Sequence, residues 1–226
     1  MKVSTMKVRI NGITPIIGGV PMDKELFTKF VASKANSEKK VKSLKNDELV
    51  ESGKTEREFA DEDVNLVQDM LDERSITGFY RDPKTNNLII RDYQVKGFLK
   101  SAAKALKDQL KLVSYLSKMD NFVFIVERNI PIMRDGEWIK DPDGYIERPL
   151  RAETMQGSRV ALAKSEMVEE GWYAEFTIKV VENNGTAKSV AIDLDLIKDL
   201  LSYGELKGML QWRNGGNGSF TYEVIG

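Results

Sequence analysis

The longest regular pattern in this 226-residue chain predicts an amphipathic helix from about Tyr93 to Leu116. On a helical wheel its apolar residues fall within an arc of about 100°. These residues are Val95, Leu99, Ala102, Ala103, Leu106, Leu110 and Val113. Five lysines fall within an arc of about 80°, centred roughly 110° away: Lys96, Lys100, Lys104, Lys107 and Lys111. One side of the helix must therefore face a core, and an adjacent side is a row of cations, called here the lysine row.

The lysine row needs an explanation, because like charges four residues apart repel by a few tenths of a kcal/mol (about 0.2–0.5) per pair. Asp108 is the one acid inside the predicted helix that could relieve this repulsion. A polyanion explains a stripe of one sign, since each lysine near a phosphate releases bound counterions. The alternative is a solvated charged face without a ligand.

Strand patterns surround this helix. Residues 3–10 alternate with a period of two, residues 158–164 are a further strand, and within 172–181 the apolar side chains share one face. A hairpin is expected before Ile90, and a second helix from Ile192 to Tyr203. The remaining strands are expected at Phe122–Val126 and Thr221–Ile225. This order predicts an α+β fold with a ferredoxin-like β-α-β-β-α-β core, an antiparallel sheet and both helices on one face.

Residues 23–75 are predicted to be a charged insertion of loops and helix within a single domain spanning 1–226. Lys34 to Asp63 is rich in both charges and poor in large apolar residues, which is typical of a solvated segment. A flap over a ligand is the alternative. Asp61 to Asp72 has helical spacing, and its first acids are best explained as charges that favour a helix N-terminus rather than as a metal site.

Composition excludes several classes of enzyme, because the chain has no histidine and no cysteine. Imidazole bases, Ser-His-Asp and Cys-His nucleophiles, thiolate metal sites and disulfides are therefore absent. The net charge is −1, so nucleic-acid binding would need a locally basic surface. No apolar run is long enough to span a bilayer and the N-terminus does not have the pattern of a signal peptide, so we expect a cytoplasmic protein without membrane contact. We expect no catalytic residue, metal ion or cofactor.

Two further segments could contact a polyanion. Gly215, Gly216 and Gly218 could let backbone N–H groups approach a phosphate, with Trp212 and Arg213 beside them for stacking and charge. The alternative is a turn that uses glycine for positive φ. A second basic zone contains Arg148, Arg151, Arg159 and Lys164, and scattered surface charge is its alternative explanation.

The segment Ile76–Lys100 resembles the RAMP superfamily, the proteins that form the RNA-binding backbone of CRISPR effector complexes. Arg81-Asp82-Pro83, Thr85 and the block Val95–Lys100 match the family's pattern. The family has Pro-Gly-Ser-Ser where this chain has Arg91–Gln94.

Two later segments are similar to the family in the same order. Glu166–Phe176 is similar to its central strand pair, and Gly204–Phe220 is similar to its glycine-rich loop before the last strand. The resemblance covers about half of the chain, and the block at the start of the helix is its specific part.

The resemblance implies a ferredoxin-like core with RNA along the sheet face, Lys96 and Lys100 on phosphates and the glycine-rich loop near the RNA backbone. Members that cut a target carry an aspartate a few residues before the Arg-Asp-Pro block, where this chain has Ser75, Ile76 and Thr77. Members that process RNA often use histidine, which this chain lacks. The chain is also similar to compact RAMP-like proteins of phages and prophages.

These observations predict a protein that binds single-stranded nucleic acid without cleaving it. RNA is the expected ligand, and ssDNA is the alternative. Its expected contacts are Arg91, Tyr93, Lys96, Lys100, Lys104, Lys107, Arg148, Arg151, Arg159, Lys164, Trp212, Arg213, Gly215, Gly216 and Gly218. The main alternative is an oligomerising interaction module, such as a phage structural protein or an anti-defence protein that mimics an effector subunit. Its partners would be further copies or effector-like subunits. A metal-dependent nuclease using Asp72 or Asp82 is a third hypothesis.

Overall fold

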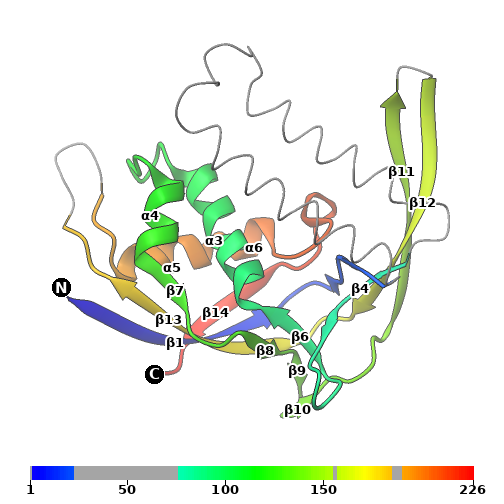
Figure 1. Ribbon diagram of the computed structural model, residues 1–226, viewed down its shortest axis with the longest axis horizontal. Coiled ribbons are helices and arrows are strands. Elements are labelled where there is room, and N and C mark those ends of the chain that lie inside the picture. The colour runs from blue at the N-terminus through cyan, green and yellow to red at the C-terminus, as the bar shows by residue number, and fades with distance from the viewer. Residues whose placement is uncertain (1, 23–75, 155–156, 185–189) are drawn as a thin grey trace. The chain divides into compact units, whose positions relative to one another are not determined.

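The computed structural model describes residues 2–22, 76–154, 157–184 and 190–226 (Figure 1). Its contacts divide into two compact units, and each is described by itself. The first contains Met1–Gly19, Phe79–Gly144 and Glu166–Gly226, and the second contains Val20–Gly78 and Tyr145–Ser165. The predicted insertion 23–75, with its helix at Asp61 to Asp72, lies outside the described residues. The prediction of one domain spanning 1–226 stays a prediction.

An antiparallel sheet forms the centre of the first unit. β1 (Val3–Gly12) pairs with β13 (Tyr173–Val181) on one side and with β14 (Phe220–Val224) on the other. The other edge of β13 pairs with β7 (Val123–Ile125) and with β9 (Met133–Arg134), which forms a hairpin with β10 (Glu137–Trp138). The resulting strand order is β14, β1, β13 and then β7 or β9.

Helices cover one face of this sheet (Figure 1). They are α3 (Asp92–Leu106), α4 (Tyr115–Phe122), α5 (Leu194–Ser202) and the short α6 (Gly204–Lys207). α3 contacts α5 and β7, while α5 contacts β1 and β14. The fold is therefore a mixed α+β arrangement with mostly antiparallel strands.

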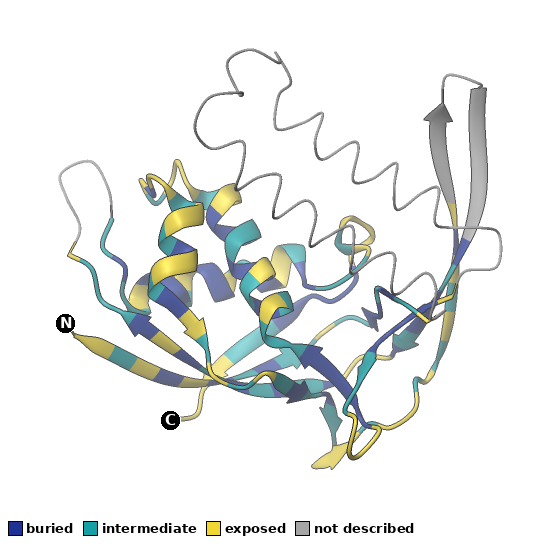
Figure 2. Ribbon diagram, in the orientation of Figure 1, coloured by how far each residue is buried: buried dark blue, intermediate teal, exposed yellow. Residues whose placement is uncertain are grey.

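The core lies between the helices and the alternating apolar positions of β1 and β13 (Figure 2). The buried residues of these strands are Met6, Val8, Ile10, Ala174, Phe176, Ile178 and Val180. Their neighbours on the opposite face are polar, as expected for a sheet that buries one side. The alternation in residues 3–10 and 172–181 thus predicted the buried face correctly.

The predicted helix from Tyr93 to Leu116 is shorter in the structure. α3 ends at Leu106, and the chain then turns, with Lys111 and Ser114 at φ 50° and 55°. A helix of 24 residues would extend about 36 Å, whereas the chain must return through α4 to pair β7 with β13. Val113, predicted in the core, is 54% exposed, and Leu112 is buried instead. Lys111 consequently lies beyond the helix.

Shorter strands complete the first unit. β5 (Tyr80–Arg81), β6 (Leu88–Arg91) and β8 (Asn129–Pro131) form an antiparallel sheet, which confirms the predicted hairpin before Ile90. β2 (Ile16–Ile17) pairs with Met167 and Val168 at the end of β12 (Gly157–Val168). None of the helices among the described residues is long and apolar enough to cross a membrane.

The second unit is built on a long hairpin. β11 (Gly144–Thr154) pairs with β12 (Gly157–Val168), and β12 pairs in parallel with β4 (Ile76–Gly78). β3 (Val20–Pro21) is antiparallel to β4. At the β12–β4 pairing the buried hydroxyls of Thr77 and Ser165 are hydrogen-bonded at 2.7 Å. The strand expected at 158–164 is therefore part of β12.

Candidate nucleic-acid interface

The N-terminus of α3 is fixed by its own first residues. The backbone N–H of Arg91, at the N-cap, donates to Oε1 of Gln94 at 2.9 Å. Oδ1 of Asp92 accepts from the N–H of Tyr93 at 2.8 Å, and its negative charge favours the positive end of the helix. The sequence Arg91–Gln94 therefore starts the helix by side-chain capping.

Two tyrosines and an arginine lie together at this helix start. The hydroxyl of Tyr93 donates to that of Tyr80 at 2.6 Å, and the two rings meet edge to face with centroids 6.2 Å apart. The Arg91 guanidinium lies over the Tyr80 ring, 5.5 Å from its centroid. Burial, together with the bond to Tyr80, raises the pKa of Tyr93, so its hydroxyl stays neutral. Tyr93 is nevertheless 46% exposed, which leaves ring surface for stacking.

Tyr93 lies on the same side of α3 as the lysine row. At about 100° per residue it falls roughly 60° from Lys96, within the arc that also contains Lys100 and Lys104. Lys107 follows at the C-cap, still in helical conformation. An exposed aromatic ring and four lysines thus share one face of the helix.

One carboxylate neutralises part of this row. Oδ1 of Asp120, in α4, lies 2.5 Å from Nζ of Lys100 and 3.8 Å from Nζ of Lys96. Nζ of Lys96 also donates to the Asp120 carbonyl at 3.1 Å and lies 5.3 Å from the Phe124 ring centroid. Burial lowers the pKa of Lys96, and the Asp120 charge opposes that shift.

Lys104 and Lys107 remain exposed and make no ion pair with any described residue. The row therefore carries more positive than negative charge. Sequence reasoning missed both Tyr80 and Asp120. Tyr80 directly precedes the Arg-Asp-Pro block, whereas nothing in the sequence pairs Asp120 with Lys100.

The Arg-Asp-Pro block shapes the turn between β5 and β6. Oδ1 of Asp82 accepts from the N–H groups of Lys84 and Thr85 at 2.9 and 3.1 Å, and Oδ2 accepts from Nδ2 of Asn129 at 3.0 Å. These bonds lower the pKa of Asp82. Asn129 in turn accepts from Nη1 of Arg91. The turn is thereby connected to the start of α3.

Arg81 has a similar structural role. Its Nη2 lies 2.9 Å from Oε1 of the buried Glu166, whose Oε2 accepts from the N–H of Phe79 at 2.9 Å. Its Nη1 donates to the Lys140 carbonyl at 2.6 Å. No group of three acidic residues suited to a metal ion occurs among the described residues.

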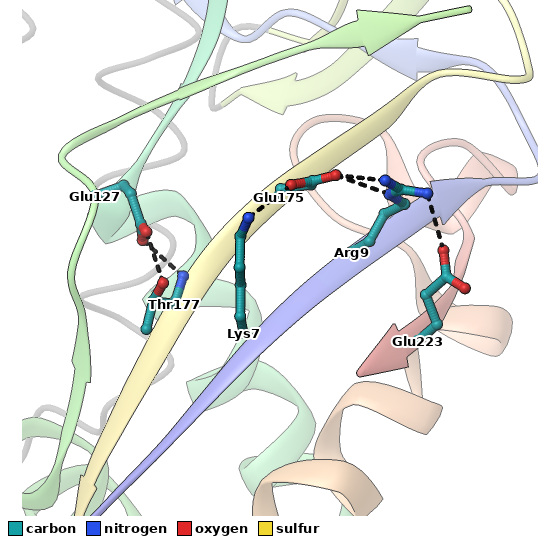
Figure 3. Close-up of polar contacts among 6 residues, drawn as sticks. All are labelled: Lys7, Arg9, Glu127, Glu175, Thr177 and Glu223. Atoms are coloured by element: carbon teal, nitrogen blue, oxygen red, sulfur yellow. Dashed lines mark hydrogen bonds and ion pairs between the residues drawn. The ribbon is translucent and has the colours of Figure 1, made fainter. Parts of the chain in front are cut away.

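The polar face of the central sheet is paired within itself (Figure 3). Oε1 of Glu175 accepts from Nε and Nη2 of Arg9 at 3.0 and 2.6 Å, and Oε2 lies 3.0 Å from Nζ of Lys7. Nη1 of Arg9 lies 3.4 Å from Oε1 of Glu223. Further along the sheet, Glu127 accepts from the N–H and hydroxyl of Thr177 at 2.6 and 2.7 Å.

This pairing bears on the expectation that RNA lies along the sheet face. Both cations of β1 on this face, Lys7 and Arg9, already face carboxylates. A phosphate here would have to compete with Glu175 and Glu223. The face of α3 is the less neutralised of the two surfaces.

The N–H groups of the three glycines in the glycine-rich loop donate to carbonyl groups of this chain. Gly215 donates to the Trp212 carbonyl at 3.0 Å, Gly216 to Arg213 at 3.1 Å and Gly218 to Pro15 at 2.8 Å. Gly216 and Gly218 have φ of 81° and 73°. Their conformation favours the alternative explanation for this loop, positive φ, over an open anion cradle. Trp212, 37% exposed, packs its indole against Gly215.

The second basic zone belongs to the second unit. Arg148 is 7% exposed, and burial lowers its pKa. Nζ of Lys164 lies 3.3 Å from Oε1 of Glu147 and 5.1 Å from the Tyr145 ring centroid. Arg151 and Arg159 lie on β11 and β12, and their side chains are outside the described residues. Within the first unit, the structure brings Arg91 and Tyr93 together with the lysines of α3.

Comparisons with known proteins give a structural likeness only. No family model and no curated protein matches the sequence. A chain of the type III-B Cmr-beta bound to cognate target RNA has a TM-score of 0.49 at 12% identity, covering 99% of this chain. This chain spans 61% of the length of that one. A chain of a type IV-B CRISPR complex has a TM-score of 0.44 at 9% identity. The match covers 98% of this chain and 90% of the chain from that complex. Neither TM-score reaches 0.5, so the function is inferred below from the residues of this chain.

Proposed function

We propose that this protein binds single-stranded RNA along the α3 surface and does not cleave it. The α3 surface is defined as Tyr80, Arg91, Tyr93, Lys96, Lys100, Lys104 and Lys107. Phosphates would lie along the lysines, and a base would stack on Tyr93. This is the role of a RAMP-like subunit, as the resemblance of Ile76–Lys100 implies.

The observation that carries the proposal is the alignment of an exposed ring with an excess of positive charge. Tyr93 shares its helix face with four lysines, and Asp120 is the one carboxylate paired with them among the described residues. Single-stranded nucleic acids are bound by this combination, because phosphates need cations and unstacked bases need flat aromatic surfaces. A merely solvated helix face would not need Tyr93 held beside Tyr80 and Arg91.

The order of elements supports a ferredoxin-like core for this function. Taken along the chain, β1, α3, β7, β13, α5 and β14 follow the order β-α-β-β-α-β. Both helices lie on one face of the sheet, and the segments between these elements form the additional strands. We assign the chain to this arrangement as part of the proposal.

The chemistry that the chain retains supports the proposal of binding without cleavage. It has no histidine to act as a base, and the carboxylate oxygens of Asp82 accept hydrogen bonds from its own turn and from Asn129. Asp72, the other acid considered for a nuclease, lies outside the described residues. Labelled RNA incubated with the protein and Mg²⁺ should therefore keep its full length on a denaturing gel, and shorter products would contradict this part of the proposal.

Fluorescence anisotropy with a labelled single-stranded RNA tests binding itself. Affinity should fall steeply as salt rises, because bound phosphates release counterions from the strand. A duplex of the same sequence should bind more weakly, since its bases cannot stack on Tyr93. Equal affinity for the single strand and the duplex, or an affinity that does not depend on salt, would contradict RNA binding along the α3 surface.

Light scattering after size exclusion separates this function from the alternative of an interaction module. The proposal expects a particle whose mass increases when RNA is added. A closed assembly of several copies that forms without RNA and ignores added RNA would favour the alternative.

A further inference from the structure

Two turns of the first unit border an open hollow of about 560 Å³. One turn joins β5 to β6, with Asn86 at φ 59°, and the other joins β9 to β10 through Asp135 and Gly136 at φ 53° and 84°. Residues of both turns line the hollow: Thr85, Asn87, Gly136, Glu137, Trp138 and Lys140. None of these residues belongs to the α3 surface.

A large aromatic side chain borders the hollow. Trp138 is 51% exposed, although it belongs to a paired strand. Its partner across the hairpin is Met133, and its indole makes no ring contact with another described residue. Exposed tryptophan beside a concave surface is typical of a binding site, because the indole offers a wide flat face to a ligand.

A buried polar group lies in the same hollow. Asn87 is 2% exposed, and its Oδ1 has no hydrogen-bond partner among the described residues. Buried acceptors are normally paired, and an unpaired one is a reason to look for a ligand. Asn87 lines the hollow, and the χ2 torsion of asparagine is soft, so its amide can reorient toward a ligand bound there.

We propose that this hollow binds one unstacked nucleobase, a proposal that rests on the RNA binding proposed above. The base would stack on Trp138 and donate an exocyclic amino hydrogen to Oδ1 of Asn87. Lys140, exposed at the same hollow, would hold a neighbouring phosphate. Cytosine and adenine present an amino group at this edge, whereas uracil presents a carbonyl. The hollow therefore favours amino-bearing bases over uracil.

The hollow and the α3 surface are connected through a short strand. β6 leads from Leu88, next to Asn87, to Arg91 at the N-cap of α3, a span of roughly 10 Å. Asp82 of the same turn binds Asn129, and Asn129 binds Arg91. One strand of RNA can therefore contact both places, with its phosphates along the lysines and one base in the hollow.

The test compares oligocytidylate with oligouridylate of equal length and in the same buffer. The full chain should bind oligocytidylate about fivefold more tightly. Trp138→Ala should weaken oligocytidylate binding about tenfold, while Trp138→Phe, which retains a ring, should lose much less. Asn87→Leu, which keeps the branched shape of the side chain without the acceptor, should remove the preference for cytosine and leave oligouridylate binding almost unchanged.

The outcomes separate the hollow from the proposed function. RNA binding that depends on Lys100 but is unaffected by Trp138→Ala would overturn the hollow and leave the proposed function standing. If Asn87→Leu fails to fold, Trp138→Ala and Trp138→Phe still test whether a base stacks in the hollow, because Trp138 is exposed. If no RNA strand binds, cytidine monophosphate is added alone. A shift of the Trp138 indole N–H resonance would then support the hollow without the α3 surface, and no shift would overturn it.

Discussion

Oδ1 of Asp120 lies 2.5 Å from Nζ of Lys100, and through this contact α4 neutralises part of the positive charge that α3 presents. The same oxygen lies 3.8 Å from Nζ of Lys96. Asp120 thus acts as an internal competitor for the phosphates that the lysine row would bind.

Asp120→Asn should strengthen RNA binding. The substitution removes the negative charge beside Lys100 and Lys96, so affinity at low salt should rise about threefold, with a steeper dependence on salt. Asp195→Asn is the matched control, because Asp195 pairs with Lys198 at 2.8 Å on α5. An unchanged affinity for Asp120→Asn would show that phosphates do not reach Lys100.

Tyr93→Ala should weaken binding of single-stranded RNA about tenfold, because it removes the ring on which a base would stack. Tyr93→Phe should bind nearly as well as the parent protein, although it loses the hydrogen bond to Tyr80. Anisotropy titrations of both variants give the comparison. If the two lose equal affinity, the hydroxyl rather than the ring is what matters.

Glu175→Gln should lower stability at neutral pH by about 0.5–1 kcal/mol, the range of partly exposed ion pairs. The hydrogen bonds from Arg9 and Lys7 lower the pKa of Glu175 below its ordinary value of 4.5. The contribution is therefore complete above that value and is lost as pH falls through the lower pKa of the folded state. Urea unfolding from pH 7 downward should show the two proteins converging in acid. A constant difference would contradict the role of the charge.

Gly97→Ala should stabilise the protein by about 1 kcal/mol, because Gly97 lies inside α3 and an added Cβ meets nothing within 4 Å. Gly204→Ala is its counterpart. There a Cβ would lie 2.4 Å from the Phe220 ring, so a loss of about 1–3 kcal/mol is expected. Thermal unfolding measures both, and a stabilised Gly204→Ala would contradict the packing of α6 on β14.

The sequence predicted the parts of the fold that depend on local periodicity. The alternation in β1 and β13 and the helical spacing of Val95, Leu99, Ala102 and Ala103 correctly identified buried positions of the core. The predicted end of α3 was wrong. The chain turns through left-handed conformations at Lys111 and Ser114, where no glycine or proline in the sequence indicates a turn. The chain bends there so that β7 can reach β13, a requirement of the tertiary structure.

The candidate site was predictable only where one element carries it. Tyr93 and the lysine row lie on a single helix, so helical spacing is enough to place them on one face. The pairing of Arg9 with Glu175 depends on the register between β1 and β13, which no local pattern fixes. The N–H of Gly218 donates to Pro15 near the other end of the chain, so its use could not be read from the loop itself.

The most direct measurement of the central claim is RNA affinity after charge reversal on α3. Lys100→Glu combined with Lys104→Glu should reduce affinity at least tenfold and flatten its dependence on salt, because two phosphate contacts are lost. Lys179→Glu combined with Lys198→Glu changes the net charge equally at positions outside the α3 surface and should cost far less. Equal losses in the two double variants would reduce the effect to net charge and contradict binding along α3.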